Sequence, residues 1–249
     1  MNFFKSFSKF HKIYFVVFLV LNVVLFFTPA VLNGENIFTL VSILGFVSTI
    51  AGLFAAIYTA RASVVCYIWG FFNAAAYACV SYFSHVYGQV ILYVLFQIPM
   101  QFVGFYLWNK SLKQGDTGEI EVRRMNAKNW ITLAIFFIVV WILYGILLKQ
   151  LPNIFEALFN VHIDPDKQFI IDSLTSTLMI CAVITSIKRY VEQWYFWILT
   201  DAVGIVLFVL SLISAKHFSF NSLSGAIMWI QFTLNGIYGF VNWKRLNKK

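Results

Sequence analysis

The sequence predicts an all-α integral membrane protein, with eight transmembrane helices in one membrane domain over residues 1–249. Of its 249 residues, 61% are hydrophobic and only 11% are charged, and the mean hydropathy is +0.80. An ordinary soluble domain is about a quarter charged, so this chain lacks the charged surface that water requires. The apolar residues also form eight stretches of about twenty residues, the length of helix that crosses a hydrocarbon core about 30 Å thick.

The predicted helices follow one another with short connections. The first, over 13–32, comes after a basic start, which is also typical of a secretory signal. It is longer than the apolar core of most signals and lacks a clean small-x-small cleavage site, so we expect a retained helix. The other helices are expected over 37–58, 64–83, 88–108, 130–148, 169–187, 194–213 and 220–241.

The formal charge of +8 indicates how the chain lies in the membrane. A nucleic-acid partner would need the basic residues gathered on one folded surface. Instead, most of them fall in alternate connections, which predicts that both termini are cytoplasmic and that no nucleic acid binds. Lys149, Lys167 and Lys216 are expected outside. The other fifteen of the eighteen are Lys5, Lys9, Lys12, Arg61, Lys110, Lys113, Arg123, Arg124, Lys128, Lys188, Arg189, Lys244, Arg245, Lys248 and Lys249.

Residue types that carry enzymatic or metal chemistry show no matching pattern. The three cysteines fall inside predicted helices, and the four histidines lie near helix ends without the spacing of metal ligands. The chain has neither a Gly-rich phosphate loop nor a nucleophile elbow. We therefore expect no catalytic residues, no bound metal and no cofactor.

The second half of the sequence repeats landmarks of the first half. Residues 37–108 form the first copy and 169–241 the second, while 109–148 hold a cytoplasmic loop and a connector helix. The offset is 128 early in each copy and 134 late, and the change falls in outside loops. The matched pairs are Ser48 and Ser176, Thr49 and Thr177, Arg61 and Arg189, Trp69 and Trp197, Asn73 and Asp201, Gln97 and Gln231, Gln101 and Asn235, and Lys110 and Lys244.

This repeat has a geometric consequence. A unit of three helices begins and ends on opposite sides of the membrane, so a copy that follows directly would be inverted. One extra crossing between the two copies gives both the same orientation. The two copies are therefore expected to be parallel, about a pseudo-twofold axis along the membrane normal. Parallel repeats with a binding site at their interface occur in SWEET sugar transporters. We expect a SWEET-like parallel 3+1+3 repeat core, with 13–32 as an extra N-terminal helix.

Polar residues near the middle of the predicted helices are candidates for a binding site. An amide or carboxylate in hydrocarbon is costly unless it faces a partner or a water-filled cavity. Asn73, Gln97, Asp201 and Gln231 lie at similar depths on four helices. With neighbours on the same helix faces, the predicted substrate-binding residues are Trp69, Asn73, Gln97, Gln101, Trp194, Trp197, Asp201, Gln231 and Asn235.

The alternative is that these amides only join helices, through hydrogen bonds worth about 0.6 kcal/mol each, and that the tryptophans are interfacial anchors. Four such groups at matching depths, with aromatic rings on the same faces, favour a ligand site. Indole rings can stack on a flat ring and amides can bond to hydroxyls. The predicted ligand is therefore a small, flat, polyhydroxylated molecule.

Two stretches resemble a known family. Residues 194–201, WYFWILTD, resemble the WxxWxxxN/D motif of the PnuC nicotinamide riboside transporters, and residues 97–108, QIPMQFVGFYLW, resemble the fourth-helix region of the same family. The likeness extends over the second to eighth predicted helices. In the first copy, Cys66 stands where the leading Trp of the motif would fall, although Trp69 and Asn73 remain. The resemblance therefore implies a weaker aromatic contribution from the first half.

The resemblance implies uptake of nicotinamide riboside across the bacterial inner (cytoplasmic) membrane by facilitated diffusion, with cytoplasmic phosphorylation trapping the product. The cationic pyridinium of this substrate could be attracted by indole faces and by Asp201. The implied partners are this small molecule, the lipid bilayer and two further copies of the chain in a homotrimer.

Three alternatives stay open at this point. The same side chains suit thiamine, another cation, and relatives of the family are thought to carry thiamine or riboflavin. Transport could also be coupled to protons through Asp172 or Asp201, the carboxylates expected inside helices. Outside transport, a membrane receptor or a membrane-embedded enzyme could use the same cavity without moving a substrate.

Overall fold

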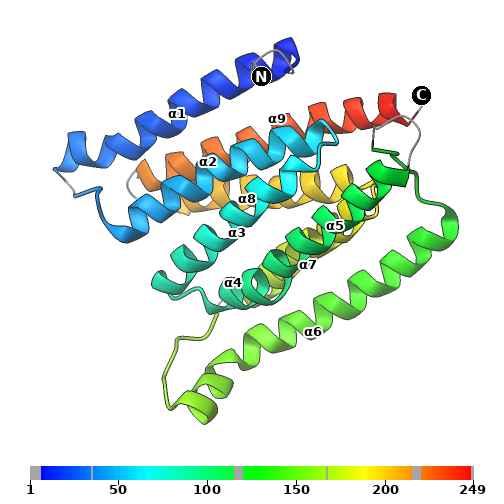
Figure 1. Cartoon of the computed structure of the whole chain (residues 1–249). Helices are drawn as coiled ribbons and strands as arrows, with labels where there is room; N and C mark the ends of the chain where they lie inside the picture. Colours follow the sequence, from blue (N-terminus) through cyan, green and yellow to red (C-terminus); the bar gives the residue numbers. More distant parts are fainter. Residues whose placement is uncertain (1–6, 35, 115–119, 167, 215–219, 248–249) are drawn as a thin grey trace.

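The computed structural model describes residues 7–34, 36–114, 120–166, 168–214 and 220–247 (Figure 1). Five of the basic residues used above to orient the chain lie outside these ranges: Lys5, Lys167, Lys216, Lys248 and Lys249.

Every predicted span forms a helix, which confirms the all-α class. The helices are α1 (Lys9–Asn33), α2 (Leu40–Ala60), α3 (Val65–Phe83), α4 (Tyr87–Leu92), the π-helical turn η2 (Tyr93–Gln97), α5 (Ile98–Gln114), α6 (Ala127–Phe159), α7 (Phe169–Ile187), α8 (Gln193–Ser214) and α9 (Phe220–Leu246). Because α4, η2 and α5 are continuous, the described part of the chain has eight helical segments. Among its residues, α1, α2, α4 to α5, α6 and α7 are long and apolar enough to cross a membrane, which makes five candidate spans.

Short polar residues define the helix ends. Ser8, Thr39 and Asn126 cap the first turns of α1, α2 and α6, each accepting a hydrogen bond from a backbone N–H three residues later. Gly34 and Asn160 end α1 and α6 in the left-handed region, at φ 67° and 53°. These caps place the turns at defined residues, so that successive helices can return through the bundle.

The structure departs from the predicted boundaries at several helix ends: α1 begins earlier, at Lys9, and α5 and α9 end later, at Gln114 and Leu246. The helix that begins at Ala127 continues past the expected end at residue 148, through Pro152, to Phe159. The fourth helical segment contains the π turn η2, directly before Pro99. Proline lacks the N–H that an α-helix would use, and a neighbouring π turn is one way in which a helix accommodates this loss. Pro99 was therefore the sequence signal for this irregularity.

The helices pack as two three-helix groups. In the first group α3 contacts α2 and α5, and in the second α8 contacts α7 and α9. The two groups meet where α2 packs against α9 and where α5 packs against α7. The remaining helices lie at opposite margins of the bundle (Figure 1), with α1 against α2 and α9 and with α6 against α7.

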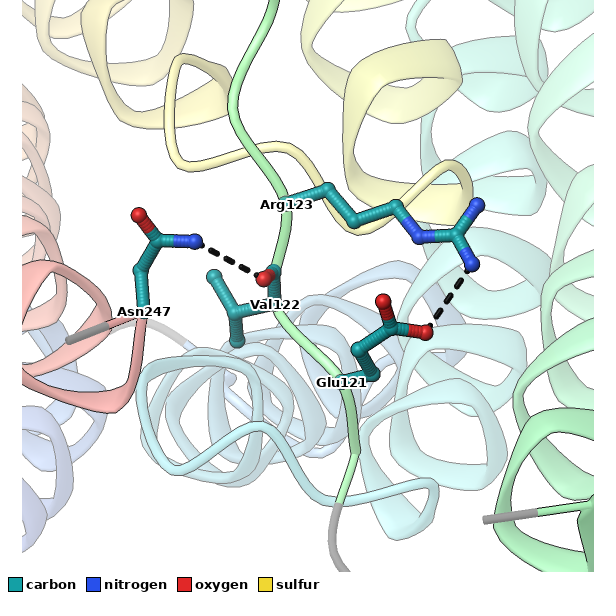
Figure 2. Close-up of polar contacts among 4 residues, drawn as sticks. All are labelled: Glu121, Val122, Arg123 and Asn247. Atoms are coloured by element: carbon teal, nitrogen blue, oxygen red, sulfur yellow. Dashed lines mark hydrogen bonds and ion pairs between the residues drawn. The ribbon is translucent and has the colours of Figure 1, made fainter. Parts of the chain in front are cut away.

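The segment before α6 is attached to the second group at one end of the bundle, which we call the connector end. Asn247 Nδ2 donates to the Val122 carbonyl over 2.9 Å, as Figure 2 shows. The Arg123 N–H donates to the Arg189 carbonyl over 2.8 Å, and the Val191 N–H donates to the Arg123 carbonyl over 2.9 Å. This segment therefore joins the end of α9 to the turn between α7 and α8.

Candidate substrate-binding site

Two indole rings join the helix groups near the connector end. Trp108 Nε1, on α5, donates to the carbonyls of Ser186 and Ile187 at the end of α7, over 3.2 Å each. Trp243 Nε1, on α9, donates to the Thr59 carbonyl at the end of α2 over 2.9 Å. The two rings lie 5.8 Å apart. The third helix of each group thus bonds to the first helix of the other.

Trp194 belongs to this packed region. Its side chain is only 2% exposed, and its ring lies edge-on to Trp243 at 6.0 Å between centroids. A Cβ added at Gly239 would collide with the Trp194 ring, so this approach between α8 and α9 requires glycine. Sequence reasoning placed Trp194 at the substrate, and the structure places it among buried aromatic residues at the connector end.

The contacts of Tyr67 on α3 match those of Trp194. Its ring lies edge-on to Trp108 at 5.1 Å and fills the space beside Gly104 on α5. In these contacts the first-half counterpart of Trp194 is therefore Tyr67, one residue after the Cys66 that the repeat arithmetic indicated. An aromatic ring is present in both halves.

Trp69 and Asn73 are held against α2. The Trp69 ring stacks on Phe54, with 4.4 Å between centroids and 21° between planes. Asn73 Nδ2 donates to the Ser48 carbonyl over 2.9 Å and to Ser48 Oγ over 3.1 Å. One face of the indole and the amide donor are thus engaged within the first group.

Gln97 and Gln101 surround the π turn. Gln97 is its last residue and is 5% exposed, and Gln101 Nε2 donates to the Gln97 carbonyl over 3.3 Å. The Gln101 amide reaches α3, where the absence of a side chain at Gly70 makes room for it. π turns are frequent at functional sites because they redirect side chains and free backbone groups.

Trp197 and Asp201 follow one another along α8. Trp197 is half-buried and packs against two apolar clusters, one containing Trp194 and the other Cys181. Asp201, one turn further, is 5% exposed. A buried carboxylate on a helix of a membrane protein is costly, so it marks a functional position unless a partner compensates it.

Gln231 and Asn235 lie where α9 meets α1 and α2. The Gln231 side chain is fully buried, its Oε1 accepts from Asn22 Nδ2 over 2.9 Å, and its backbone carbonyl accepts from the Tyr14 hydroxyl over 2.9 Å. Asn235 Nδ2 donates to the Ala56 carbonyl over 2.9 Å. Sequence reasoning missed Tyr14 and Asn22, although an amide within the apolar stretch of α1 was a signal.

Some atoms of these side chains have no hydrogen-bond partner among the described residues. They include Gln231 Nε2 and Trp194 Nε1, both inaccessible to solvent. Most buried polar atoms in folded proteins are paired, and an unpaired one costs about 1–3 kcal/mol. These two atoms are hydrogen-bond donors, so the arrangement can offer donors to a polar ligand.

Two cavities lie away from the predicted site residues. One, of about 490 Å³, opens at the connector end beside Lys110, Arg123, Lys188 and Arg189. The other, of about 360 Å³, lies between α6 and α7 around Trp141. The predicted site residues line neither of these cavities. Their hydrogen bonds and ring contacts described above lie at interfaces between helices. Over the residues that the structure describes, no group of three or more His, Cys, Asp or Glu could hold a metal ion.

Comparison with known proteins gives consistent matches. A family model described as nicotinamide mononucleotide transporter matches residues 42–245. The nicotinamide riboside transporter PnuC of Neisseria mucosa is 26% identical over 249 residues, which cover 99% of this chain and 85% of that protein. PnuC of Haemophilus influenzae is 25% identical, over 83% of this chain and 81% of its own.

A crystal structure of the vitamin B3 transporter PnuC has the same fold. It superposes with a TM-score of 0.70 at 24% identity, and the match covers 98% of this chain and 94% of that one. The family model runs from the first turn of α2 to the last turn of α9 and leaves α1 out. The resemblance to PnuC proteins is thus confirmed, and the chain belongs to the nicotinamide mononucleotide transporter family.

Proposed function

We propose that the protein takes up nicotinamide riboside across the cytoplasmic membrane of a bacterium by facilitated diffusion, and that phosphorylation in the cytoplasm traps it. The observation that carries this proposal is the Neisseria mucosa relative, which is named as a nicotinamide riboside transporter and aligns with nearly the whole chain. The buried amides and indoles described above support it, because they suit a flat ring with hydroxyl and carboxamide groups.

We propose that the protein carries out this transport with a parallel 3+1+3 core of the SWEET type. The pairs of touching helices support it, because each pair has a counterpart when the two groups are exchanged. α2 packs on α3 as α7 packs on α8, α3 packs on α5 as α8 packs on α9, and α2 packs on α9 as α7 packs on α5. The reciprocal indole bonds support it too, because their donors Trp108 and Trp243 and their acceptors Thr59 and Ser186 occupy matching places. Trp243 lies 135 positions after Trp108, against an expected offset of 134. Ser186 lies 127 positions after Thr59, against an expected offset of 128.

In the membrane, we propose that all eight helical segments cross the bilayer and that both termini are cytoplasmic. The distribution of Lys and Arg supports this orientation, because they gather in alternate connections. The connector end would then face the cytoplasm. A homotrimer is the assembly that we propose from the family resemblance.

The substrate would lie between the two groups. Trp197 would stack on the pyridinium ring, whose positive charge Asp201 would attract, with Trp69 and Trp194 as the other aromatic walls. The ribose hydroxyls and the carboxamide would bond to the amides of the site. These are Asn73, Gln97, Gln101, Gln231 and Asn235. The unpaired Gln231 Nε2 supports this role for Gln231.

The test is calorimetric titration of the purified protein with nicotinamide riboside, thiamine and riboflavin. We expect nicotinamide riboside to bind most tightly. Thiamine is the informative comparison, because it is also cationic and flat but has no ribose. Tighter binding of thiamine or riboflavin would move the proposed substrate to that vitamin, and no binding of any of the three would remove the proposal.

A further inference from the structure

Helix α1 lies outside the residues that the family model matches, yet one of its side chains reaches the proposed site. Asn22 is 8% exposed and points from α1 toward α9. Its Nδ2 makes two hydrogen bonds, to the Phe18 carbonyl over 2.7 Å and to Gln231 Oε1 over 2.9 Å. The two bonds together determine which way the Gln231 amide is turned.

The orientation of the Asn22 amide follows from the backbone carbonyl that it contacts. The Phe18 carbonyl can only accept a hydrogen bond, so the Asn22 atom beside it must be the amide nitrogen rather than the oxygen. The same nitrogen contacts Gln231, so the Gln231 atom there must be the acceptor, Oε1. Gln231 Nε2 therefore points away from Asn22, where it is buried and has no partner among the described residues.

The position of Asn22 is itself well defined, because α1 is attached to α9 at several levels. The Tyr14 hydroxyl donates to the Gln231 carbonyl over 2.9 Å, and the Tyr238 hydroxyl and Ser8 Oγ are 3.0 Å apart. Phe10 stacks on Tyr238 with 4.4 Å between centroids and 3° between planes. These contacts set the depth of α1 against α9, and with it the height at which Asn22 meets Gln231.

We propose that Asn22 is a positioning residue that holds Gln231 as a hydrogen-bond donor toward the substrate. The inference rests on the proposed function and adds a polarity to the site. At this point the site takes a ligand oxygen that accepts, such as a carbonyl or a hydroxyl, and it disfavours a group that can only donate. Helix α1 thereby takes part in substrate recognition, whereas the sequence analysis placed it only as an extra helix outside the repeat core.

The experiment is a double-mutant cycle on the affinity for nicotinamide riboside, with wild type, Asn22→Leu, Gln231→Leu and the double variant. Leu has nearly the size of Asn and removes both bonds. We expect Asn22→Leu to weaken binding about fivefold, because Gln231 can then turn its oxygen to the substrate. In the Gln231→Leu background the same change should alter affinity less than about twofold, because nothing remains to be oriented.

Thr28→Val on α1 is the matched control. Thr28 Oγ1 donates to the Val24 carbonyl over 2.7 Å, the same type of bond to the preceding turn that Asn22 makes, but Thr28 contacts no site residue through it. We expect its affinity to equal that of wild type. If Asn22→Leu is not monodisperse, Asn22→Asp replaces it, because Asp has the same shape and presents acceptors where Asn presents donors.

The outcomes separate this inference from the proposed function. Absence of nicotinamide riboside binding by wild type contradicts the proposed function. The same cycle on the thermal midpoint without ligand would then still decide whether Asn22 and Gln231 are coupled. If wild type binds and Asn22→Leu weakens binding equally in both backgrounds, or not at all, Asn22 does not act through Gln231 and the inference is wrong.

Discussion

The two halves of the molecule, α1 to α5 and α6 to α9, share a pattern of contacts but differ in the chemistry that they bring to it. In each half the third helix donates an indole N–H to the first helix of the other. In each half an aromatic ring, Tyr67 or Trp194, packs edge-on to that indole beside a glycine. These matched contacts maintain the geometry of the bundle and, because they occur in both halves, do not distinguish one half from the other.

The difference lies in the helix that covers each half. Helix α1 meets α9 through polar side chains, with Tyr14 and Asn22 bonded to Gln231. Helix α6 meets its neighbours through an apolar cluster that contains Leu148 and Ile180. Its hydrogen bonds to other elements come from Tyr144, Trp141 and Asn129, and they go to the Gly88 carbonyl, the Ile170 carbonyl and the Tyr190 hydroxyl, none of which belongs to a predicted site residue. A near-symmetric framework can thus hold an asymmetric ligand, because, among the described residues, the amide of α1 bonds to a predicted site residue and the amide of α6 does not.

The largest effect is expected from the tryptophans of the two halves. Trp197→Ala should weaken nicotinamide riboside binding about a hundredfold, because it removes both stacking and buried area, and Trp197→Phe should recover part of the loss. Trp69→Ala should cost less, because Phe54 already covers one face of that ring. Trp141→Ala on α6 is the control and should leave the affinity unchanged. Equal losses for Trp69→Ala and Trp197→Ala would remove the proposed asymmetry.

The next effect concerns the two buried amides. Gln97→Ala and Gln231→Ala should each weaken binding about tenfold, because a lost hydrogen bond costs about 1 kcal/mol or more when a partner is left unpaired. The controls are Leu95→Ala and Leu234→Ala, one on each of the same helical segments, with side chains 72% and 43% exposed at the bundle surface. Calorimetric titration measures all four, and losses as large in the controls would assign the effect to helix packing.

A smaller effect, on stability rather than affinity, should follow from the indoles at the connector end. Trp108→Phe and Trp243→Phe each remove a hydrogen bond between the groups, which should lower the free energy of unfolding by about 1–3 kcal/mol. Because their contacts match, the two losses should be similar, while affinity changes little. Thermal unfolding in detergent compares them. A loss confined to one variant would show that the matched bonds are not equivalent in energy.

The smallest effect lies in the segment before α6. A hydrogen bond from Arg123, 2.9 Å from the Glu121 carboxylate, lowers the pKa of Glu121 (Figure 2). A lowered carboxyl pKa adds stability at neutral pH that disappears as the pH falls through that pKa. The side chains are 50% and 65% exposed, so the pair contributes at most about 1 kcal/mol. The midpoint of Glu121→Gln should lie slightly below that of wild type at pH 7, and the two should converge as the pH falls through the lowered Glu121 pKa. A difference that persists at acidic pH would have another origin.

The helices could be predicted because each is a long apolar run, and periodicity and charge are local properties of the sequence. Pro99 could have indicated the π turn, since a proline within a helix disrupts its hydrogen bonds. The continuation of α6 to Phe159 was hidden because residues after Leu148 are more polar, and a helix can extend beyond the hydrocarbon.

The arrangement of the site was harder to predict, because it depends on which helices touch. The packing of Trp194 against Gly239, and the reach of Asn22 to Gln231, join positions far apart in the sequence. Repeat arithmetic matched Trp194 with Cys66, whereas the ring contacts match it with Tyr67, and ring contacts become visible only in the packed structure.

The measurement that tests the central claim most directly is uptake of nicotinamide riboside into proteoliposomes that contain only this protein, with the membrane potential clamped at zero. The clamp is needed because a cationic substrate follows the potential. The account predicts saturable uptake that stops when the internal concentration equals the external one and that a pH gradient does not change. Accumulation above the external concentration, driven by a pH gradient, would contradict facilitated diffusion, and uptake no faster than in empty liposomes would contradict transport of this substrate.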